Sequence, residues 1–244
     1  MPERLHIPYL PDGDPRHAFD LFTPDGPGPW PLLCMIHGGG WMNHGRDVVH
    51  PVCRHAAARG WAVATLGYRL APQTRHPGQR QDIAAALAAI VRDAPALGID
   101  PSRTVLQGSS AGSWLALDAA IAPPPGLRLL GIVAYCPVVV LEPRHGFVHA
   151  FLGERMDELR VAEDLAARIP AGYPPVLYLQ GDADTTTPLP LAEGFCTALR
   201  DRGIAIDLRL FPGQPHGFGW NLDSPGQSRA LPQVDAFLAR LQQG

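Results

Sequence analysis

The chain has 244 residues, 46% of them hydrophobic, and its formal net charge at pH 7 is −3. A chain of this length and composition can bury a large core, in one generous domain or in two small ones. The weakly acidic balance excludes the basic surface with which proteins bind nucleic acids or anionic membranes, so neither partner is expected.

Nothing in the sequence resembles an export signal or a membrane span. Residues 1–17 lack a basic stretch followed by an apolar one, and no apolar run approaches the roughly 20 residues that a membrane span requires. All 20 basic residues are arginine, and alanine, proline and glycine are abundant, which is typical of a GC-rich bacterial genome. We therefore expect a cytoplasmic bacterial protein. The cysteines have no metal-site spacing and are expected to be buried free thiols; they are Cys34, Cys53, Cys136 and Cys196.

The first predicted elements are two short strands, RLHIPYL and HAFDLFTP, which have no helix between them and predict an antiparallel hairpin at the edge of a sheet. After them, strands and helices alternate. Short apolar runs predict buried strands at 30–37, 61–68, 103–108, 127–136, 175–182 and 204–211. Apolar residues at helical spacing predict helices at 47–60, 80–98, 110–122, 190–203 and 227–243. The second of these helices is expected to end before Pro95 or by Gly98.

This alternation predicts the fold class. Strands that are apolar along their whole length and are separated by helices indicate a mostly parallel sheet covered on both faces, which is an α/β fold. Only the segment 137–175 departs from the pattern. We predict that it is a small lid-like insertion with one or two short helices over one end of the sheet, within a single domain of residues 1–244.

Residues whose side chains could take part in catalysis follow the strands, at the edge where open α/β sheets bind ligands. GSSAG (108–112) comes after a strand and opens a helix, which is the context of a G-x-S-x-G nucleophile elbow centred on Ser110. A serine hydroxyl is a weak nucleophile and needs a base that a carboxylate orients, in the chain order Ser, Asp or Glu, His. His216 follows the last strand, and Asp182 and Asp184 follow the strand before it. The spacing leaves both carboxylates open as the acid.

Three consecutive glycines, residues 38–40, follow the strand at 30–37. Attack on a carbonyl creates an oxyanion, which preorganised backbone N–H groups stabilise best. HGGG after the third strand is the oxyanion element of lipases and esterases, and its partner is the amide that follows the nucleophile. Here that amide belongs to Ala111.

HGGGW, YRLAP (68–72), GSSAG, GDADTTTP and HGF occur in this order. With these motifs the chain resembles serine esterases of the α/β-hydrolase superfamily. It is similar to the hormone-sensitive-lipase-like group and to the related feruloyl-esterase-like and kynurenine-formamidase-like hydrolases. The resemblance extends from about Pro8 to the C-terminus, nearly the whole chain.

The resemblance implies an α/β-hydrolase fold with Ser110 as the nucleophile and His216 as the base. The family pattern G-x-x-D-x-x-x-P, which fits residues 181–188, favours Asp184 over Asp182 as the acid. The resemblance also implies that the oxyanion donors are the amides of Gly39, Gly40 and Ala111, and it implies no cofactor and no metal.

Two features depart from the lipase-like pattern. Few residues precede His37, and Trp41 after the glycines is more typical of the feruloyl-esterase-like and formamidase groups. Both favour a compact pocket over one for a long acyl chain. Trp41 and Ser109 are expected to bind the substrate, and the insertion 137–175, which includes Phe147, is expected to form part of the pocket wall.

The leading prediction is therefore hydrolysis of a small carboxylic ester through a serine acyl-enzyme. One alternative is amide or formamide hydrolysis of the kynurenine-formamidase kind, which uses the same chemistry in a different pocket. Another is a ligand-binding protein on a hydrolase scaffold, which is disfavoured because every catalytic part is present. The sequence leaves open whether the chain is a monomer or a homodimer.

Overall fold

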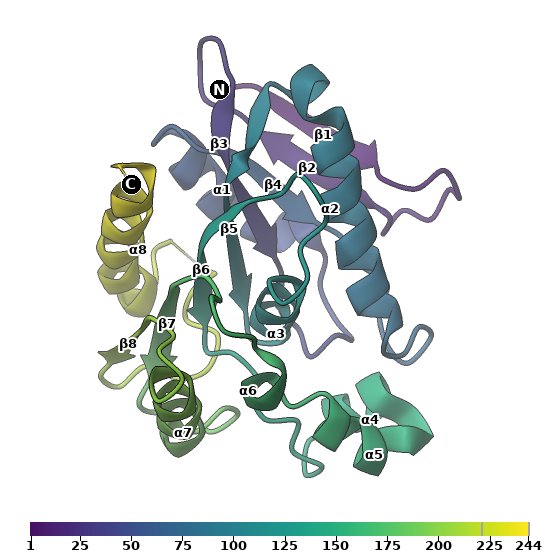
Figure 1. The fold of residues 1–244 in the computed structure, drawn as a ribbon, viewed down its shortest axis with the longest axis vertical. Helices are drawn as coiled ribbons and strands as arrows, with labels where there is room; N and C mark the ends of the chain where they lie inside the picture. The colour runs from purple at the N-terminus through teal and green to yellow at the C-terminus, as the bar shows by residue number, and fades with distance from the viewer. Residues whose placement is uncertain (221, 244) are drawn as a thin grey trace.

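One eight-stranded sheet runs through the centre of this computed structural model, which describes residues 1–220 and 222–243 (Figure 1). The strand order is β1-β2-β4-β3-β5-β6-β7-β8. The strands are β1 (Glu3–Pro8), β2 (Ala18–Phe22), β3 (Trp30–Ile36), β4 (Ala62–Leu66), β5 (Ile99–Ser109), β6 (Leu129–Tyr135), β7 (Val176–Gly181) and β8 (Ile206–Phe211). From β4 to β8 all neighbouring strands are parallel, so the predicted α/β fold is confirmed.

The two N-terminal strands are antiparallel, as predicted, but only one of them lies at the sheet edge. β1 pairs with β2, and β2 in turn pairs antiparallel with β4 in a register that joins Phe19 to Leu66. All five residues of β2 are buried, whereas most of β1 is exposed. The predicted antiparallel hairpin at the edge of the sheet is therefore present, with β1 as the outermost strand and β2 joining it to β4.

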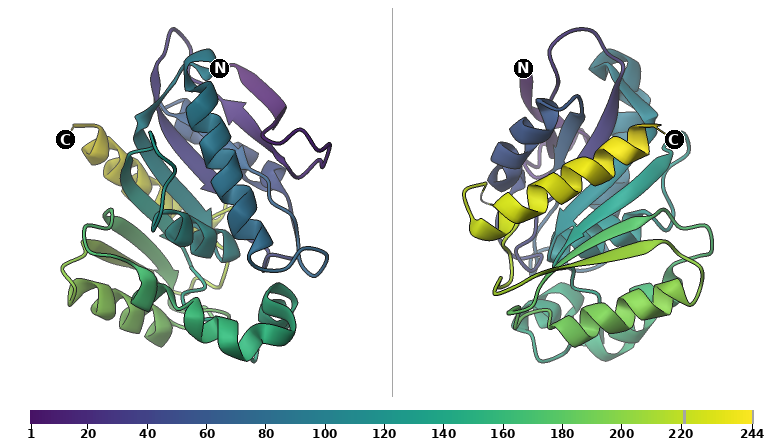
Figure 2. Two further views of the ribbon diagram at one scale, coloured as in Figure 1. Left: turned by 45° about the vertical axis from the view of Figure 1, so that its right-hand side comes forward. Right: turned by 90° about the vertical axis from the view of Figure 1, so that its left-hand side faces the viewer.

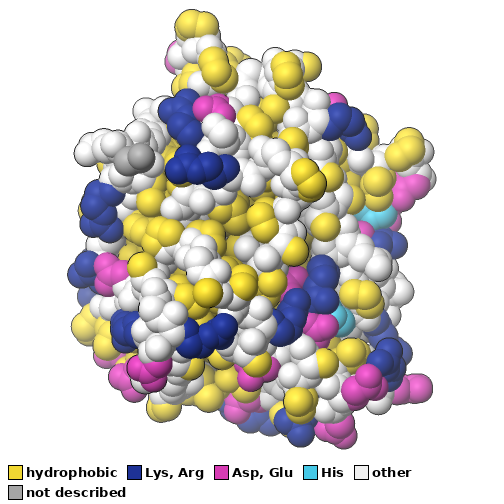
Figure 3. Space-filling view, in the orientation of Figure 1, with side chains coloured by type: hydrophobic (Ala, Val, Ile, Leu, Met, Phe, Trp, Pro, Cys, Tyr) yellow, Lys and Arg dark blue, Asp and Glu magenta, His cyan; other side chains and the backbone are white. Residues whose placement is uncertain are grey.

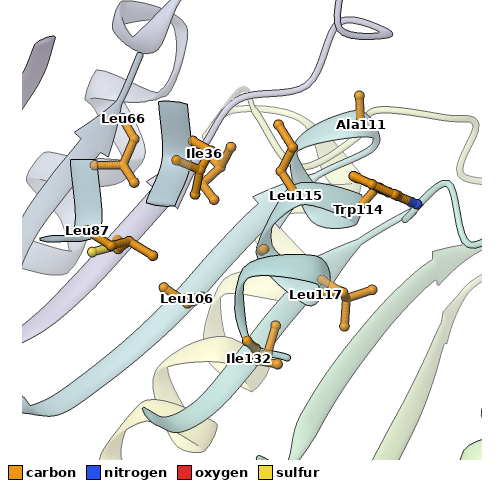
Figure 4. Close-up of a cluster of buried hydrophobic side chains, with 14 of the residues drawn as sticks. Ile36, Leu66, Leu87, Leu106, Ala111, Trp114, Leu115, Leu117 and Ile132 are labelled. Atoms are coloured by element: carbon orange, nitrogen blue, oxygen red, sulfur yellow. The ribbon is translucent and has the colours of Figure 1, made fainter. Parts of the chain in front are cut away.

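Helices cover both faces of the sheet. α1 (His50–Ala57) and α8 (Pro225–Gln243) lie on one face, and α2 (Gly78–Leu97) and α3 (Ala111–Ala119) lie on the other (Figure 2). Alternate residues of a strand point to opposite faces, and accordingly Leu33 packs in the core under α1 and α8 while Leu32 packs in the core under α2 and α3. Figure 4 shows the second core, where Leu115 and Leu117 of α3 lie over the sheet.

α2 does not end before Pro95. It continues to Leu97, and Gly98 then adopts a left-handed conformation with φ 70°, which terminates the helix. The remaining long helix is α7 (Leu189–Arg200), and a short 3-10 helix, η1 (Arg46–Val49), precedes α1. No helix in the described part of the chain is long and apolar enough to span a bilayer. Arginine and acidic side chains are mixed over the face shown in Figure 3.

Between β6 and β7 the chain forms three short helices and a 3-10 turn, more than the one or two helices expected. They are α4 (Gly146–Leu152), η2 (Gly153–Arg155), α5 (Met156–Ala162) and α6 (Leu165–Arg168). Helices of four to seven residues are too short to leave a periodic pattern in the sequence. Phe151 and Leu165 are fully buried and attach this segment to the core.

A buried group of charged side chains, here named the ionic cluster, also joins this segment to the body of the fold. It consists of His76, Arg80, Asp118, Glu163 and Arg168. Both arginines form ion pairs with Asp118 on α3 and with Glu163, which directly follows α5, and His76 Nε2 lies 3.0 Å from Glu163 Oε1. Burial alone would raise the pKa of Glu163, but the hydrogen bonds from His76 and Arg80 lower that pKa to about 2.

Candidate active site

Ser110 occupies the sharp turn between β5 and α3, at the carboxyl edge of the sheet. Its backbone has φ 54° and ψ −120°, in the left-handed region that favours glycine. The Ser110 amide donates to the carbonyl of Tyr135 at 2.8 Å, which fixes the turn against β6. Such strain is retained where the surrounding structure enforces it, and here it sets the hydroxyl at the first turn of a helix.

The structure brings Ser110, His216 and Asp184 together from three separate loops. Nε2 of His216 lies 2.7 Å from Oγ of Ser110, and Nδ1 of the same ring lies 2.8 Å from Oδ2 of Asp184. His216 stands in the loop between β8 and α8, and Asp184 stands just after β7. A tautomer with the proton on Nδ1 donates to the carboxylate and leaves Nε2 free to accept the serine proton.

Asp184 is held by several neutral donors in addition to His216. Its Oδ1 accepts hydrogen bonds from the amides of Thr186 and Thr187, both at 2.8 Å. Its Oδ2 accepts from the Thr187 hydroxyl at 2.8 Å and from the Gln180 amide at 3.2 Å. Burial would raise the pKa of Asp184, but the hydrogen bonds from His216 and Thr187 outweigh it and lower that pKa below its ordinary value. The carboxylate therefore stays ionised beside the imidazole.

Asp182, the other candidate acid, lies elsewhere. Its side chain is exposed, and its Oδ1 accepts a hydrogen bond at 2.6 Å from the amide of Gly213. This contact attaches the loop that contains His216 to the end of β7. Of the two carboxylates, the structure therefore places Asp184 against the imidazole.

Of the three expected oxyanion donors, Gly39 and Gly40 line the same cavity as Ser110, and Ala111 is the next residue in the chain. In the described residues, the amides of Gly39, Gly40 and Ala111 have no backbone hydrogen-bond partner. Gly39 has φ 107°, a conformation that side chains rarely adopt, and its carbonyl accepts from the amides of Met42 and Asn43 at 3.0 Å each. The carbonyl of Gly39 is thus occupied within the turn, whereas the amides of Gly39 and Gly40 have no backbone acceptor in the described part of the chain.

A cavity of about 410 Å³ opens over Ser110. Its lining consists of Gly39, Gly40, His44, Ser110, Phe147, Thr186, His216, Gly217 and Trp220. A larger hollow of about 570 Å³ lies between β8 and α8, but it contains none of the three residues of the serine site. We therefore take the smaller cavity as the candidate substrate site, because a serine hydroxyl, an imidazole and two glycines of the 38–40 loop line it.

Three aromatic rings, His44, Phe147 and Trp220, form what we name the aromatic wall of this cavity. His44 lies edge-on to Trp220, with ring centroids 5.0 Å apart. The wall packs directly against residues 38–40, which we name the glycine loop. A Cβ added to Gly38 would lie 2.8 Å from Trp220 Cζ2, and one added to Gly40 would lie 2.9 Å from Phe147 Cβ.

The expectation that Trp41 and Ser109 contact the substrate needs correction, because neither side chain lines the cavity. Trp41 is fully buried and stacks on Phe151, with centroids 4.0 Å apart and planes 8° apart. The Ser109 hydroxyl accepts a hydrogen bond from Nε1 of Trp220 and so helps to hold this ring of the aromatic wall in place. His44, Thr186 and Trp220 were missed in the sequence. Trp220 lies four residues after His216, but no motif covers it.

One group among the described residues has the composition of a metal site. The ligand atoms of Cys136, Asp184 and His216 all lie within 4.8 Å of one another. Cys136 follows β6, is fully buried and has φ 43°. Burial raises the pKa of its thiol to about 12, so the thiol is protonated at neutral pH.

Comparison with known proteins gives two family matches. The model of the prolyl oligopeptidase family matches residues 77–243, and a family model described as BD-FAE matches residues 19–123. Together the two matches cover the chain from β2 to the end of α8.

The chain is also similar to proteins named as ester hydrolases. It is 30% identical to an ethyl acetate hydrolase of Pseudomonas putida, over 89% of this chain and 71% of that protein. It is 28% identical to a probable isoprenylcysteine alpha-carbonyl methylesterase of Oryza sativa, over 83% of this chain, but it spans only 54% of the length of that relative. Among solved structures, esterase B from Lactobacillus rhamnosis superposes with a TM-score of 0.87 over 99% of this chain and 86% of that one. At 23% sequence identity, this last likeness shows the shared fold.

Proposed function

The chain belongs to the prolyl oligopeptidase family and to the hormone-sensitive-lipase-like serine esterases of the α/β-hydrolase fold, and on this premise we propose that it hydrolyses small carboxylic esters through an acyl-enzyme on Ser110. The observation that supports this proposal best is the continuous hydrogen-bonded array of Ser110, His216 and Asp184, at 2.7 and 2.8 Å, in a cavity that Gly39 and Gly40 also line.

In this mechanism the substrate carbonyl lies between Oγ of Ser110 and the amides of Gly39, Gly40 and Ala111. As Oγ attacks the carbonyl carbon, its proton passes to Nε2 of His216, and the developing oxyanion accepts hydrogen bonds from the amides. The imidazolium then gives its proton to the leaving alcohol. Water repeats the sequence on the acyl-enzyme and releases the carboxylic acid. Asp184 stays ionised and stabilises the imidazolium in both halves of the reaction.

The size of the cavity favours a short acyl chain. The volume of about 410 Å³ is bounded by the aromatic wall, and Trp41, Phe151 and Trp114 fill the space behind Phe147 with closely packed rings. A long alkyl chain would have to displace these buried rings. The relative from Pseudomonas putida is named for the hydrolysis of ethyl acetate, an ester with a two-carbon acyl group, which agrees with this preference.

The aromatic wall favours a second candidate, hydrolysis of an N-formyl arylamine of the kynurenine-formamidase kind. His44, Phe147 and Trp220 would pack against an aryl ring as readily as against an ester. The bond-breaking chemistry is the same for both candidates, so only the preferred substrate separates them.

The experiment is a panel of p-nitrophenyl esters from acetyl to dodecanoyl, together with N-formylkynurenine, tested with wild type and Ser110→Ala side by side. We expect the highest kcat/KM for acetyl to butyryl esters and a fall of at least about tenfold by octanoyl. Ser110→Ala is expected to lower kcat by about 10³-fold or more. Preference for the formamide would select the second candidate, and near-normal turnover by Ser110→Ala would exclude both. EDTA is expected to leave the rate of the metal-free enzyme unchanged.

A further inference from the structure

Cys136 takes no part in the proposed hydrolysis, although it lies directly beside the residues that perform it. Its Sγ, a carboxylate oxygen of Asp184 and a ring nitrogen of His216 are all within 4.8 Å of one another. The chain holds the thiol there: the Cys136 amide donates to the carbonyl of Leu179 at 2.8 Å, and the backbone adopts φ 43°, which is uncommon for any residue other than glycine.

A thiolate, an imidazole and a carboxylate are the three ligand types that zinc prefers in proteins. In a tetrahedral site with the usual bond lengths, neighbouring ligand atoms lie about 3.3–3.6 Å apart. The separation of 2.8 Å between Asp184 Oδ2 and His216 Nδ1, and the limit of 4.8 Å for the group, both require shifts of about an ångström or less. Three protein ligands would leave the fourth position of the metal to water.

We propose that Cys136, Asp184 and His216 form an inhibitory site for Zn²⁺, in which the cation takes the place of the proton between His216 and Asp184. This inference rests on the proposed function only for its consequence, the loss of activity, and not for the binding itself.

Protons and charges balance when zinc binds, and no redox step is needed. The thiol of Cys136 releases its proton to solvent as the S–Zn bond forms, and Asp184 is already ionised. The imidazole of His216 stays neutral: Nδ1 binds the cation and the ring proton moves to Nε2. Nε2 then donates toward Ser110 Oγ instead of accepting from it. The serine proton has no acceptor in this tautomer, so the first step of hydrolysis stops.

The neighbouring groups are compatible with both states. The Thr187 hydroxyl and the Gln180 amide donate to Asp184 Oδ2 at 2.8 and 3.2 Å, and they hold the carboxylate in place whether a proton or a cation lies beside it. Cys136 and Asp184 are buried behind the partly exposed ring of His216. Because the cation has to enter past this ring, we expect the activity to fall gradually after zinc and protein are mixed, and not at once.

The first test measures ester hydrolysis by metal-free enzyme after incubation with ZnCl₂, each variant being normalised to its own metal-free rate. Wild type is expected to lose at least about tenfold in activity, and EDTA should restore it. Cys136→Ser should require at least about 30-fold more zinc for the same loss, because a hydroxyl is a poor zinc ligand. Cys196→Ser, a change at another buried thiol, on α7 and outside the group of three ligands, is the matched control and should respond like wild type.

The second test is independent of activity. Co²⁺ bound by a thiolate gives an intense near-ultraviolet absorption, which we expect in wild type and in the inactive Ser110→Ala variant, but not in Cys136→Ser. The cobalt measurement tests the metal site separately from the proposed ester hydrolysis, since it remains informative if no ester is hydrolysed. Should Cys136→Ser fail to fold, Cys136→Ala replaces it. Equal zinc sensitivity of wild type and the Cys136 variant, or a wild-type cobalt complex without thiolate absorption, would overturn the proposal.

Discussion

Two buried carboxylates in this molecule are stabilised in different ways. Asp184 accepts hydrogen bonds from backbone amides, a hydroxyl and a carboxamide, and its Oδ2 also lies 2.8 Å from Nδ1 of His216. Glu163 is surrounded by the guanidinium groups of Arg80 and Arg168 together with His76. Both carboxylates have a pKa below the ordinary value.

The difference follows from whether the local charge has to change. A guanidinium keeps its charge at every accessible pH, so it neutralises Glu163 permanently and suits a structural anchor. Neutral donors keep Asp184 ionised without cancelling its charge, as the proposed mechanism requires if the carboxylate is to stabilise an imidazolium at His216. Four predictions test this contrast, in order of decreasing expected effect.

Replacing Asp184 should remove most of the activity and little of the fold. Asp184→Asn is expected to lower kcat for p-nitrophenyl acetate by about 10³-fold or more, because the amide cannot stabilise the imidazolium and favours the wrong tautomer. Its oxygen can still accept from the amides of Thr186 and Thr187, so the circular dichroism spectrum should match that of wild type. A decrease of less than tenfold would contradict the role assigned to Asp184.

Replacing Glu163 should have the opposite outcome. Glu163→Gln leaves Arg80 and Arg168 with a single carboxylate, Asp118, and is expected to cost about 3 kcal/mol of unfolding free energy, measured by urea denaturation. We expect kcat to change by less than about threefold. Glu158→Gln, which breaks an exposed ion pair with Arg155, is the control and should cause no measurable change in stability.

The ionic cluster should also make stability depend on pH. The pKa of Glu163 is about 2 in the folded chain and 4.5 in its reference state, so below pH 4.5 the unfolded chain binds the proton more readily. The contribution of Glu163 to the free energy of unfolding is complete above that pH and is lost as the pH falls toward 2. Between pH 6 and pH 3.5, we expect the difference in unfolding free energy between wild type and Glu163→Gln to shrink by about 1 kcal/mol. A constant difference would show that Glu163 is not the group responsible.

Asp182 should matter least. Asp182→Asn retains an oxygen that can accept from the Gly213 amide, so the loop that contains His216 keeps its attachment. We expect kcat/KM for p-nitrophenyl acetate to fall by less than about threefold. If this variant loses more activity than Asp184→Asn, the acid has been assigned to the wrong carboxylate.

Much of this molecule can be predicted from its sequence because the relevant signals are local. Buried parallel strands are continuous apolar runs, and a nucleophile elbow, a glycine loop and a histidine loop each fit within a few residues after a strand. The fold prediction is confirmed on that basis. The preference for Asp184 over Asp182, in contrast, follows from the family resemblance, whose pattern fits residues 181–188.

The remainder depends on contacts between distant segments. The bond from Trp220 to Ser109 joins residues 111 positions apart, so the sequence around either one does not reveal the aromatic wall. Trp41 looked like a pocket residue because it follows the glycines, yet it packs beneath Phe147 and Phe151. The place of Cys136 beside Asp184 likewise depends on the pairing of β6 with β7.

The close fit of the aromatic wall on the glycine loop limits how this site can diversify. Any side chain at Gly38 or Gly40 would collide with Trp220 or Phe147, so the loop cannot vary one residue at a time. Substitutions in the wall meet no such barrier, because His44, Phe147 and Trp220 are each at least partly exposed in the cavity. Divergence or directed evolution toward other substrates should therefore accumulate at these three positions while the glycines stay fixed.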